Sequence, residues 1–380
     1  MSASAGHGIV IFRYCSIADR ALPLHRNSKN DVMVRHTKIL LFLILIWFVV
    51  LGDMWANEGD SVSLRPSFSV EYSGEIQSDF RRIKFASLLE LGVVLPLSKH
   101  FDIEVSSVSF VTSATEPLVD NIQGYSNIDA ETVPFALAVA GLSWHINDAH
   151  RLFAGIRRID EDYFCSDGLS LFTGSSCGGF PTITTNFDIA AYPMASIGLH
   201  YDYVGEVFDV KSSIYNGVGH NAWSGRDNVF RFCPKSDGLF ALAQLGVHKS
   251  KVDAYLGASL HYGEQCGIET SQLKVRPVVW TYAELDLGKG FSAIGAFSHA
   301  LSSDAVCRNF CGIGGSFEWR KMQLGVFSNY TRADEVDEWQ TELTCNYSCT
   351  RVLSIQPALH YFNTGGQSHC VGMVRLSVRL

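Results

Sequence analysis

The chain has 380 residues, of which 47% are apolar and 18% charged, with a net charge of −8 and a mean hydropathy of +0.11. An acidic chain lacks the basic face that nucleic acids require, so we exclude a nucleic-acid partner. The composition also argues against a protein made of membrane-spanning helices, since each such helix needs about 20 consecutive apolar residues.

The N-terminal part of the chain has the pattern of a secretory signal peptide. Arg35 and Lys38 precede the apolar run ILLFLILIWFVVL at 39–51, and the small residue Ala56 follows it. A positive region, a short apolar region and a small residue are typical of a cleaved export signal, and a short N-terminal anchor is the alternative. We therefore expect a non-structural extension at 1–32, translation from Met33, a signal peptide at 33–56 and one mature domain at 57–380.

Beyond residue 56 the dominant pattern is an alternation of apolar and polar residues, which indicates β-strands with one buried face. Residues with turn propensity join these strands into hairpins. FALAVAGLSWHI at 135–146 runs into Asn147 and Asp148 and returns as RLFAGIRRI at 151–159. The same pattern predicts further hairpins around 195–204, 239–247, 278–287 and 316–331.

The predicted connections alternate between very short turns and long polar loops. Outer-membrane barrels have short turns at one end, long loops at the other and girdles of aromatic residues, for which 24 Phe, 14 Tyr and 7 Trp are available. At roughly 20 residues per strand and connection, the domain has room for about 16 strands, enough to enclose an aqueous channel. The sequence therefore predicts an all-β protein, a transmembrane antiparallel β-barrel of the bacterial outer membrane. The long loops are expected at 112–134, 160–190, 217–237 and 302–312.

The last eight residues, MVRLSVRL, illustrate the alternation. Val374, Leu376 and Val378 stand on one side of the strand, and Arg375 and Arg379 stand on the other. A charge that faces lipid at mid-membrane costs about 2–4 kcal/mol, whereas a charge in the lumen is tolerated. We expect the apolar side to face lipid and the two arginines to face water.

Eight of the ten cysteines form pairs of sequence neighbours. In an exported protein such pairs predict disulfides that staple loops. The alternative is a metal site, because CRNFC and CNYSC are both C-x3-C motifs, but neither has a second set of ligands at matched spacing. We expect no metal and no cofactor. The predicted pairs are Cys165 with Cys177, Cys233 with Cys266, Cys307 with Cys311, and Cys345 with Cys349.

The last 40 residues also show a characteristic order of strands. A strand with Glu342 and Tyr347 is followed by a turn, by the segment SIQP at 354–357 and by a terminal strand with Arg375. This order resembles the end of the carbohydrate-selective porins of bacterial outer membranes, the OprB type. SWHINDAHRLFAGIRRIDEDYF at 143–164 is similar to the hairpin that leads into the large inward-folding loop of that family.

The resemblance implies a 16-stranded barrel, often trimeric, that is surrounded by outer-membrane lipid and lets sugars diffuse inward. A sugar needs hydrogen-bond donors and acceptors at the constriction and aromatic rings against its apolar face, and pore radius and lining groups set selectivity. Two candidates, Arg157 and Arg158, are adjacent on a strand, so at most one should point inward. The other pore-lining candidates are Asp160, Glu161, Asp162, Tyr163, Trp223, Glu342, Gln356 and Arg375.

Other functions are compatible with a barrel. A general diffusion porin or a plugged structural barrel would have the same strand pattern. A soluble secreted β protein is a further alternative, and it would differ from a barrel because its purification needs no detergent. A barrel enzyme would need a nucleophile beside a histidine held by an acid. We expect no enzymatic activity, although several histidines lie in or near strands: His145, His200, His261, His299 and His360.

Overall fold

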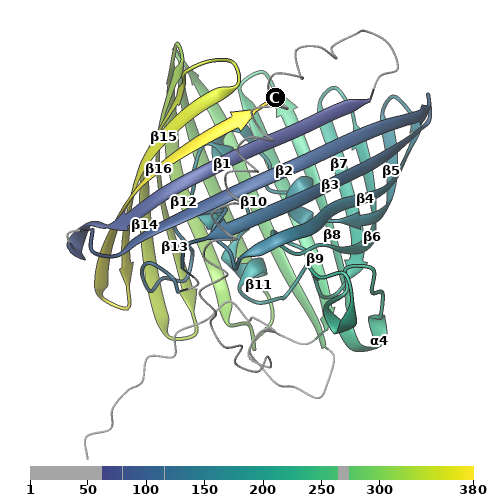
Figure 1. Cartoon of the computed structure of the whole chain (residues 1–380), viewed down its shortest axis with the longest axis horizontal. Helices are drawn as coiled ribbons and strands as arrows, with labels where there is room; N and C mark the ends of the chain where they lie inside the picture. The colour runs from purple at the N-terminus through teal and green to yellow at the C-terminus, as the bar shows by residue number, and fades with distance from the viewer. Residues whose placement is uncertain (1–61, 79, 115, 264–273) are drawn as a thin grey trace, which may run out of the picture.

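The computed structural model describes residues 62–78, 80–114, 116–263 and 274–380, and these form a closed barrel of sixteen antiparallel strands (Figure 1). The predicted extension and signal peptide lie outside the described residues, as does Cys266. The predicted number of strands is confirmed. The strands are β1 (Ser63–Glu75), β2 (Ile83–Ser98), β3 (Phe101–Thr112), β4 (Val133–Asn147), β5 (His150–Arg157), β6 (Ser196–Val204), β7 (Phe208–Asn216), β8 (Leu239–Lys249), β9 (Val252–Gly263), β10 (Lys274–Gly288), β11 (Phe291–Ala300), β12 (Cys307–Trp319), β13 (Met322–Ala333), β14 (Val336–Ser348), β15 (Leu353–Thr364) and β16 (Gln367–Arg379).

The first and last strands close the barrel. β1 pairs with β16 in antiparallel register, with Phe68 opposite Val378 and Glu71 opposite Arg375. Each strand therefore has a hydrogen-bonded neighbour on both sides. Closure satisfies the edge groups that an open sheet would leave unpaired, which is the condition for a sheet to lie in lipid.

The wall follows the predicted alternation. In β16, Val374 and Leu376 are exposed on the outer surface, whereas Met373 and Ser377 are buried inside. Arg375 also faces inward, where it bonds to Glu71. The outer surface carries many such exposed large apolar side chains, as expected of a wall in contact with lipid. Among the described residues, no helix has the length and apolar character to cross a membrane.

The long loops lie together at one end of the barrel, as predicted, although that end also has two two-residue turns, at 334–335 and 365–366. The predicted turn at Asn147 and Asp148 joins β4 to β5, and the other predicted hairpins are present. The connections at the opposite end are all short, and we call it the short-turn end. In Figure 1 it lies at the top with the C-terminus, and α4 (Pro234–Asp237) in the β7–β8 loop lies at the bottom. One predicted loop, 302–312, is too long, because β12 begins at Cys307 and its residues from 309 onward pair with β13.

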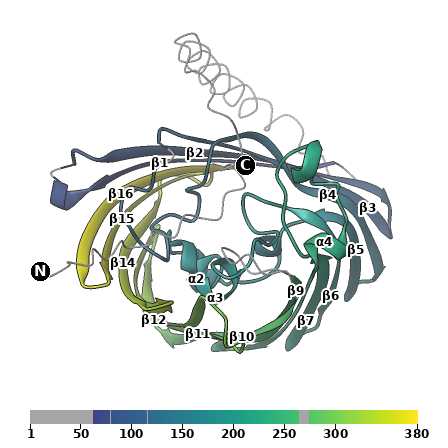
Figure 2. The ribbon, with the colours of Figure 1, turned by 90° about the horizontal axis from the view of Figure 1, so that it is seen from below.

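The loop between β5 and β6 folds into the barrel, where α2 and α3 lie within the ring of strands (Figure 2). Its apolar side chains, including Phe164, Phe172 and Phe180, are buried against inward residues of the opposite wall such as Trp280 and Phe310. This apolar contact keeps the loop inside the lumen. The loop contains η3 (Ile159–Glu161), α2 (Asp167–Ser170), η4 (Ser175–Cys177) and α3 (Pro181–Thr184).

The predicted disulfides are not present in the described part of the chain, where eight cysteines are free thiols. Cys307 and Cys311 lie four residues apart on β12, about 13 Å along a strand, whereas the Cα atoms of a disulfide lie within about 7 Å. A register shift at the start of β12 also leaves Cys307 buried while Cys311 is exposed. The free cysteines are Cys165, Cys177, Cys233, Cys307, Cys311, Cys345, Cys349 and Cys370.

The same geometry separates Cys345 from Cys349, which flank the end of β14. Cys177 is buried in the inward loop, and burial raises the pKa of its thiol well above the ordinary value. A neutral, enclosed thiol reacts slowly with a disulfide, so this cysteine in particular is expected to stay reduced.

We expect alkylation of the denatured, unreduced protein to modify all eight of these cysteines, because none has a disulfide partner. Mass spectrometry of the digested protein measures this directly. As a control, a second sample is reduced before alkylation, and the two peptide maps should agree at these positions. A peptide that is labelled only after reduction would contradict the structure there.

Candidate pore and vestibule

Polar side chains on the inner wall hold the β5–β6 loop in place. Glu342, on β14, is only 2% exposed. Its carboxylate accepts hydrogen bonds from the backbone N–H of Thr173 at 2.8 Å, from the Thr173 hydroxyl at 2.9 Å and from the backbone N–H of Gly174 at 3.0 Å. On β15, the Gln356 amide donates to the carbonyl of Leu171 at 2.6 Å. Two predicted pore residues therefore act as loop anchors.

A second loop, between β3 and β4, is anchored in the same way to the neighbouring wall. Arg375 donates to Asn127 Oδ1 at 2.6 Å and pairs with the buried Glu71. On β14, the Glu338 carboxylate accepts from the backbone N–H groups of Ile122, at 2.6 Å, and Gln123, at 2.9 Å. Arg375 thus faces the lumen as predicted, but its guanidinium N–H groups bond to Glu71 on the wall and to Asn127 in the loop.

The two inward loops also contact each other. Asn127 donates from its backbone N–H to the carbonyl of Thr173 at 2.7 Å, and Ser175 donates likewise to Gly124 at 3.2 Å. Together the loops occupy the lumen along β8–β16. The space that remains lies along the other side of the barrel, against the strands at the N-terminal half of the chain.

That space is a cavity of about 770 Å³ that opens toward the short-turn end, and we call it the vestibule. Its wall comes from β1 to β7, and its lining includes the Asn147–His150 turn and the last residues of β16. Both signs of charge are represented in it. The charged and histidine residues that line it are Arg65, Glu90, Glu104, His145, Asp148, His150, Arg151, Arg157, Glu161, Asp162, Asp202, Lys211 and Arg379.

Ion pairs organise the floor of the vestibule. Arg157 forms a two-pronged pair with Asp162, with both N···O distances at 2.6 Å, and reaches Glu104 at 3.2 Å. Arg151 pairs with Asp202 at 2.6 Å and with Glu104 at 3.2 Å. Because the acids and bases alternate within one network, the lining has many hydrogen-bonding atoms and little excess charge.

Both predicted arginines at the mouth of the β5–β6 loop lie inside the barrel, contrary to the expectation that at most one would. Alternation holds only along a strand, and β5 ends at Arg157. Arg158, 5% exposed, pairs with Glu161 at the start of the loop and with Glu90 on β2, at 3.4 Å. Asp160, 3.5 Å from the Arg158 guanidinium, also accepts from the backbone N–H of Tyr192 at 3.0 Å.

Tyr192 supports this arrangement from the far end of the same loop. The guanidinium of Arg158 lies 5.6 Å from the centre of its ring. Burial raises the pKa of the Tyr192 hydroxyl although Arg158 opposes that effect. The group therefore stays protonated and donates to the carbonyl of Ile128 at 3.1 Å, which links the two inward loops once more.

Two predicted aromatic contacts are not at the vestibule. Tyr163 is fully buried in the β5–β6 loop, where its hydroxyl lies 2.8 Å from that of Ser213. Trp223 stacks on Phe135 with the ring centres 5.4 Å apart, and both rings are exposed. Phe135 precedes the inward-facing Ala136 on β4, so Trp223 lies on the outer side of the wall. The structure gives no support for sugar stacking by either residue.

Ser213, His200 and Asp202 form a hydrogen-bonded chain that resembles a hydrolase triad. The Ser213 hydroxyl is 2.6 Å from one ring nitrogen of His200, and Asp202 is 2.7 Å from the other. Ser213 and His200 are buried and are not part of the vestibule lining, and Tyr163 also contacts the serine. A nucleophile needs access to its substrate, so this chain is structural in the described conformation.

Asp162 lies close enough to His200 and Asp202 for the three to share a metal ion. The carboxylates already have cationic partners, however. Asp162 pairs with Arg157, and Asp202 pairs with an arginine on β5. The arginines supply the positive charge that an ion would otherwise bring, so we assign no metal to this cluster.

Three residues predicted from the sequence, Arg157, Glu161 and Asp162, line the vestibule, whereas the wall residues that complete their network were not predicted. The pattern that could have identified them is the alternation along the neighbouring strands, in which inward acidic and basic residues alternate with outward apolar residues. FDIEV at 101–105 shows it. The wall residues that were missed are Glu90, Glu104, Arg151, Asp202 and Lys211.

A closed barrel of sixteen antiparallel strands with an inward loop and a charged vestibule defines the class as a porin-type barrel. Solved structures share the fold. Pseudomonas putida OprB at high pH is 13% identical, with a TM-score of 0.69 over 87% of this chain and 96% of that chain. An anion-selective porin from Comamonas acidovorans is 10% identical, with a TM-score of 0.60 over 84% and 99%.

A third solved structure is a loop-deletion mutant of OmpT, an outer membrane protein of Vibrio cholerae. It is 11% identical, with a TM-score of 0.56 over 84% of this chain and 99% of that chain. No family model and no curated protein sequence matches the chain. At these identities the likeness establishes the fold.

Proposed function

We propose that this protein is an outer-membrane pore for the passive diffusion of small hydrophilic solutes, and that it favours sugars. The observation that carries the proposal is the vestibule, a polar cavity enclosed by a barrel whose outer wall is apolar. An inward loop narrows the lumen beside it. Passive passage needs a pore radius and suitable lining groups, not a reacting centre.

The charge arrangement supports sugars over ions. Arg157 and Arg151 are each paired with carboxylates, so the floor offers little net field to attract an ion of either sign. Guanidinium groups still have several donors and carboxylates several acceptor sites. Such a surface suits a neutral solute with many hydroxyl groups. The sequence resemblance to carbohydrate-selective porins supports the same choice.

Export by the N-terminal signal at 33–56 and assembly into a homotrimer belong to the proposal as well. The signal pattern supports export, and the outer wall supports a lipid environment. N-terminal sequencing of the protein from outer membranes tests export, with a start near Asn57 expected. Chemical crosslinking in membranes tests assembly into a homotrimer.

Single-channel conductance in a planar bilayer tests the function. We expect stepwise openings that mono- or oligosaccharides block in a saturable way, because a bound sugar would occupy the vestibule. Heat-denatured protein, in which the barrel is lost, serves as the control for detergent artefacts. Openings that no sugar changes would make the protein a general diffusion porin.

A plugged structural barrel is the second candidate, and the contact between the two inward loops favours it. The Asn127–Thr173 and Ser175–Gly124 hydrogen bonds join the loops across the lumen. A correctly folded sample that shows no openings would support the plug and overturn the pore.

A further inference from the structure

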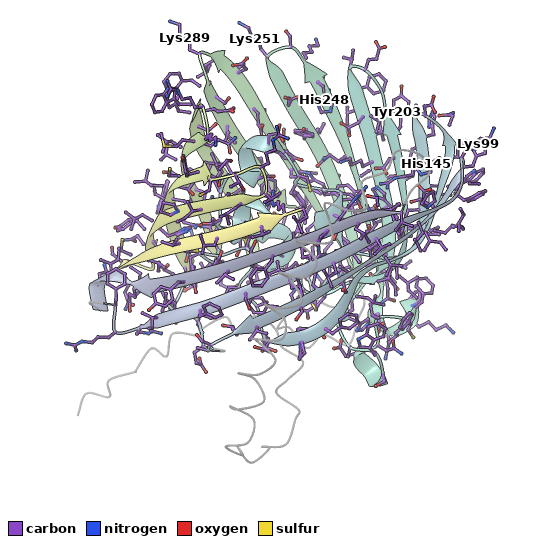
Figure 3. The ribbon with its side chains drawn as sticks, turned by 45° about the horizontal axis from the view of Figure 1, so that its top comes forward. Lys99, His145, Tyr203, His248, Lys251 and Lys289 are labelled. Atoms are coloured by element: carbon purple, nitrogen blue, oxygen red, sulfur yellow. The ribbon has the colours of Figure 1, made fainter. Side chains whose placement is uncertain are left out.

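Basic residues gather in the short turns at one end of the barrel. Figure 3 shows Lys99, Lys251 and Lys289 at this rim, at the tips of separate turns. The β12–β13 turn contributes Arg320 and Lys321, and all five of these side chains are exposed. The pattern depends on the topology, because these residues are far apart in the sequence and meet only when the strands close.

The cations are densest on three adjacent turns, which join β10 to β11, β12 to β13 and β14 to β15. Because these strands are consecutive neighbours in the barrel, adjacent turns lie about 10 Å apart. No Asp or Glu occurs within the three turns, at 288–290, 320–321 and 349–352. We call the four cations of these turns the basic turn patch: Lys289, Arg320, Lys321 and Arg351.

A row of aromatic side chains lies on the outer wall next to the patch. Phe291 and Phe317 stack on neighbouring strands with their ring centres 4.5 Å apart. Trp319 and Tyr347 are 54% and 44% exposed, and both lie opposite Met322 across β13. Aromatic rings on the outer wall of a barrel mark the depth of the lipid headgroups.

One contact ties the patch to this row. The guanidinium of Arg320 lies over the ring of Trp319, 5.0 Å from its centre. Arg320 therefore faces the outer, lipid side of the rim instead of the lumen. Of the acids nearest these turns, Glu318 alternates with the outward Trp319 and so points to the inner side. Asp286 lies at a register shift, and its carboxylate accepts a hydrogen bond from the backbone N–H of Gly288 at 2.7 Å.

We propose that the basic turn patch binds the phosphate headgroups of anionic phospholipids in the membrane leaflet that meets the short-turn end. Basic groups at headgroup depth attract anionic lipid, and the aromatic row holds these cations at that depth. The proposal rests on the proposed membrane location of the barrel. It does not depend on which solute the pore passes, or on whether it passes one.

Lipid binding to the purified barrel in a nonionic detergent tests the proposal. Phosphatidylglycerol is titrated in, and native mass spectrometry counts the lipids that each barrel retains. We expect the double variant R320Q/K321Q to bind phosphatidylglycerol about tenfold more weakly than the unmodified protein at low ionic strength, since each basic group near lipid contributes to the attraction.

The variant R81Q/R308Q is the matched control. It loses the same charge from exposed positions at the long-loop end and should bind phosphatidylglycerol normally. Phosphatidylcholine and inorganic phosphate are the comparison probes, and neither should show the difference between the variants. Equal affinity of the two variants for phosphatidylglycerol would overturn the proposal, and so would equally tight binding of phosphatidylcholine.

Conductance of the same variants separates the two proposals. R320Q/K321Q leaves the vestibule lining intact, so its channel conductance should match that of the unmodified protein. A barrel that lacks conductance but retains phosphatidylglycerol through these residues would refute the pore and keep the lipid site. Sugar-blocked openings together with unchanged lipid affinity would refute only the lipid site.

Discussion

Replacement of Glu342 by alanine is expected to raise the single-channel conductance and to make openings noisier. The carboxylate is the acceptor for three donors of the β5–β6 loop, two of them backbone N–H groups at Thr173 and Gly174. Each buried donor left without an acceptor costs about 1–3 kcal/mol. The loop should therefore leave its position against β14 for part of the time, and the lumen beside it should widen.

Two further variants make this result interpretable. Glu342→Gln keeps one acceptor oxygen, so its conductance should lie between those of the alanine variant and the unmodified protein. Glu338→Ala removes the equivalent anchor of the other inward loop, at Ile122 and Gln123. If Glu342→Ala conducts like the unmodified protein while both variants fold, the β5–β6 loop does not limit the pore.

Replacement of Arg157 by glutamine should make the pore prefer cations. Arg157 is 6% exposed and neutralises Asp162 and part of the charge on Glu104. Without it, the floor of the vestibule carries an excess of carboxylates. Removing one partner of a buried ion pair also costs about 3–5 kcal/mol of folding stability. The reversal potential in a KCl gradient measures the preference, and thermal denaturation measures the stability.

The opposite variant and the double variant are the controls. Asp162→Asn should shift the reversal potential toward anions, because Arg157 then lacks its closest partner. R157Q/D162N removes one charge of each sign and should return the reversal potential close to its original value. Reversal potentials that stay equal in all four proteins would show that ions do not pass this ion pair.

The strands could be predicted because their signals are local. Alternation and turn residues placed the β4–β5 hairpin at Asn147 and Asp148, and MVRLSVRL has Leu376 outward and Arg375 inward as expected. A strand has a side-chain period of two, so the faces follow from the order of the residues alone. The number of strands follows from the length of the chain and the spacing of the turns.

The cysteine prediction was wrong because sequence neighbours are not always neighbours in space. Cys307 and Cys311 are four residues apart, but an extended strand separates them beyond the reach of a disulfide. Arg158 shows the converse case. It lies inside next to Arg157 because the strand ends between them, a boundary that alternation does not reveal.

The sequence by itself determined that the chain forms a barrel of about sixteen strands with an apolar outer wall, because period, turns and length are local properties. The tertiary structure decided which inward residues bind loops and which face the vestibule. Glu342 and Thr173 are 169 positions apart, and they meet only because apolar packing draws the β5–β6 loop into the lumen. Glu342, Gln356 and Arg375 became anchors through that long-range packing, whereas Arg157 and Asp162 remained at the open space.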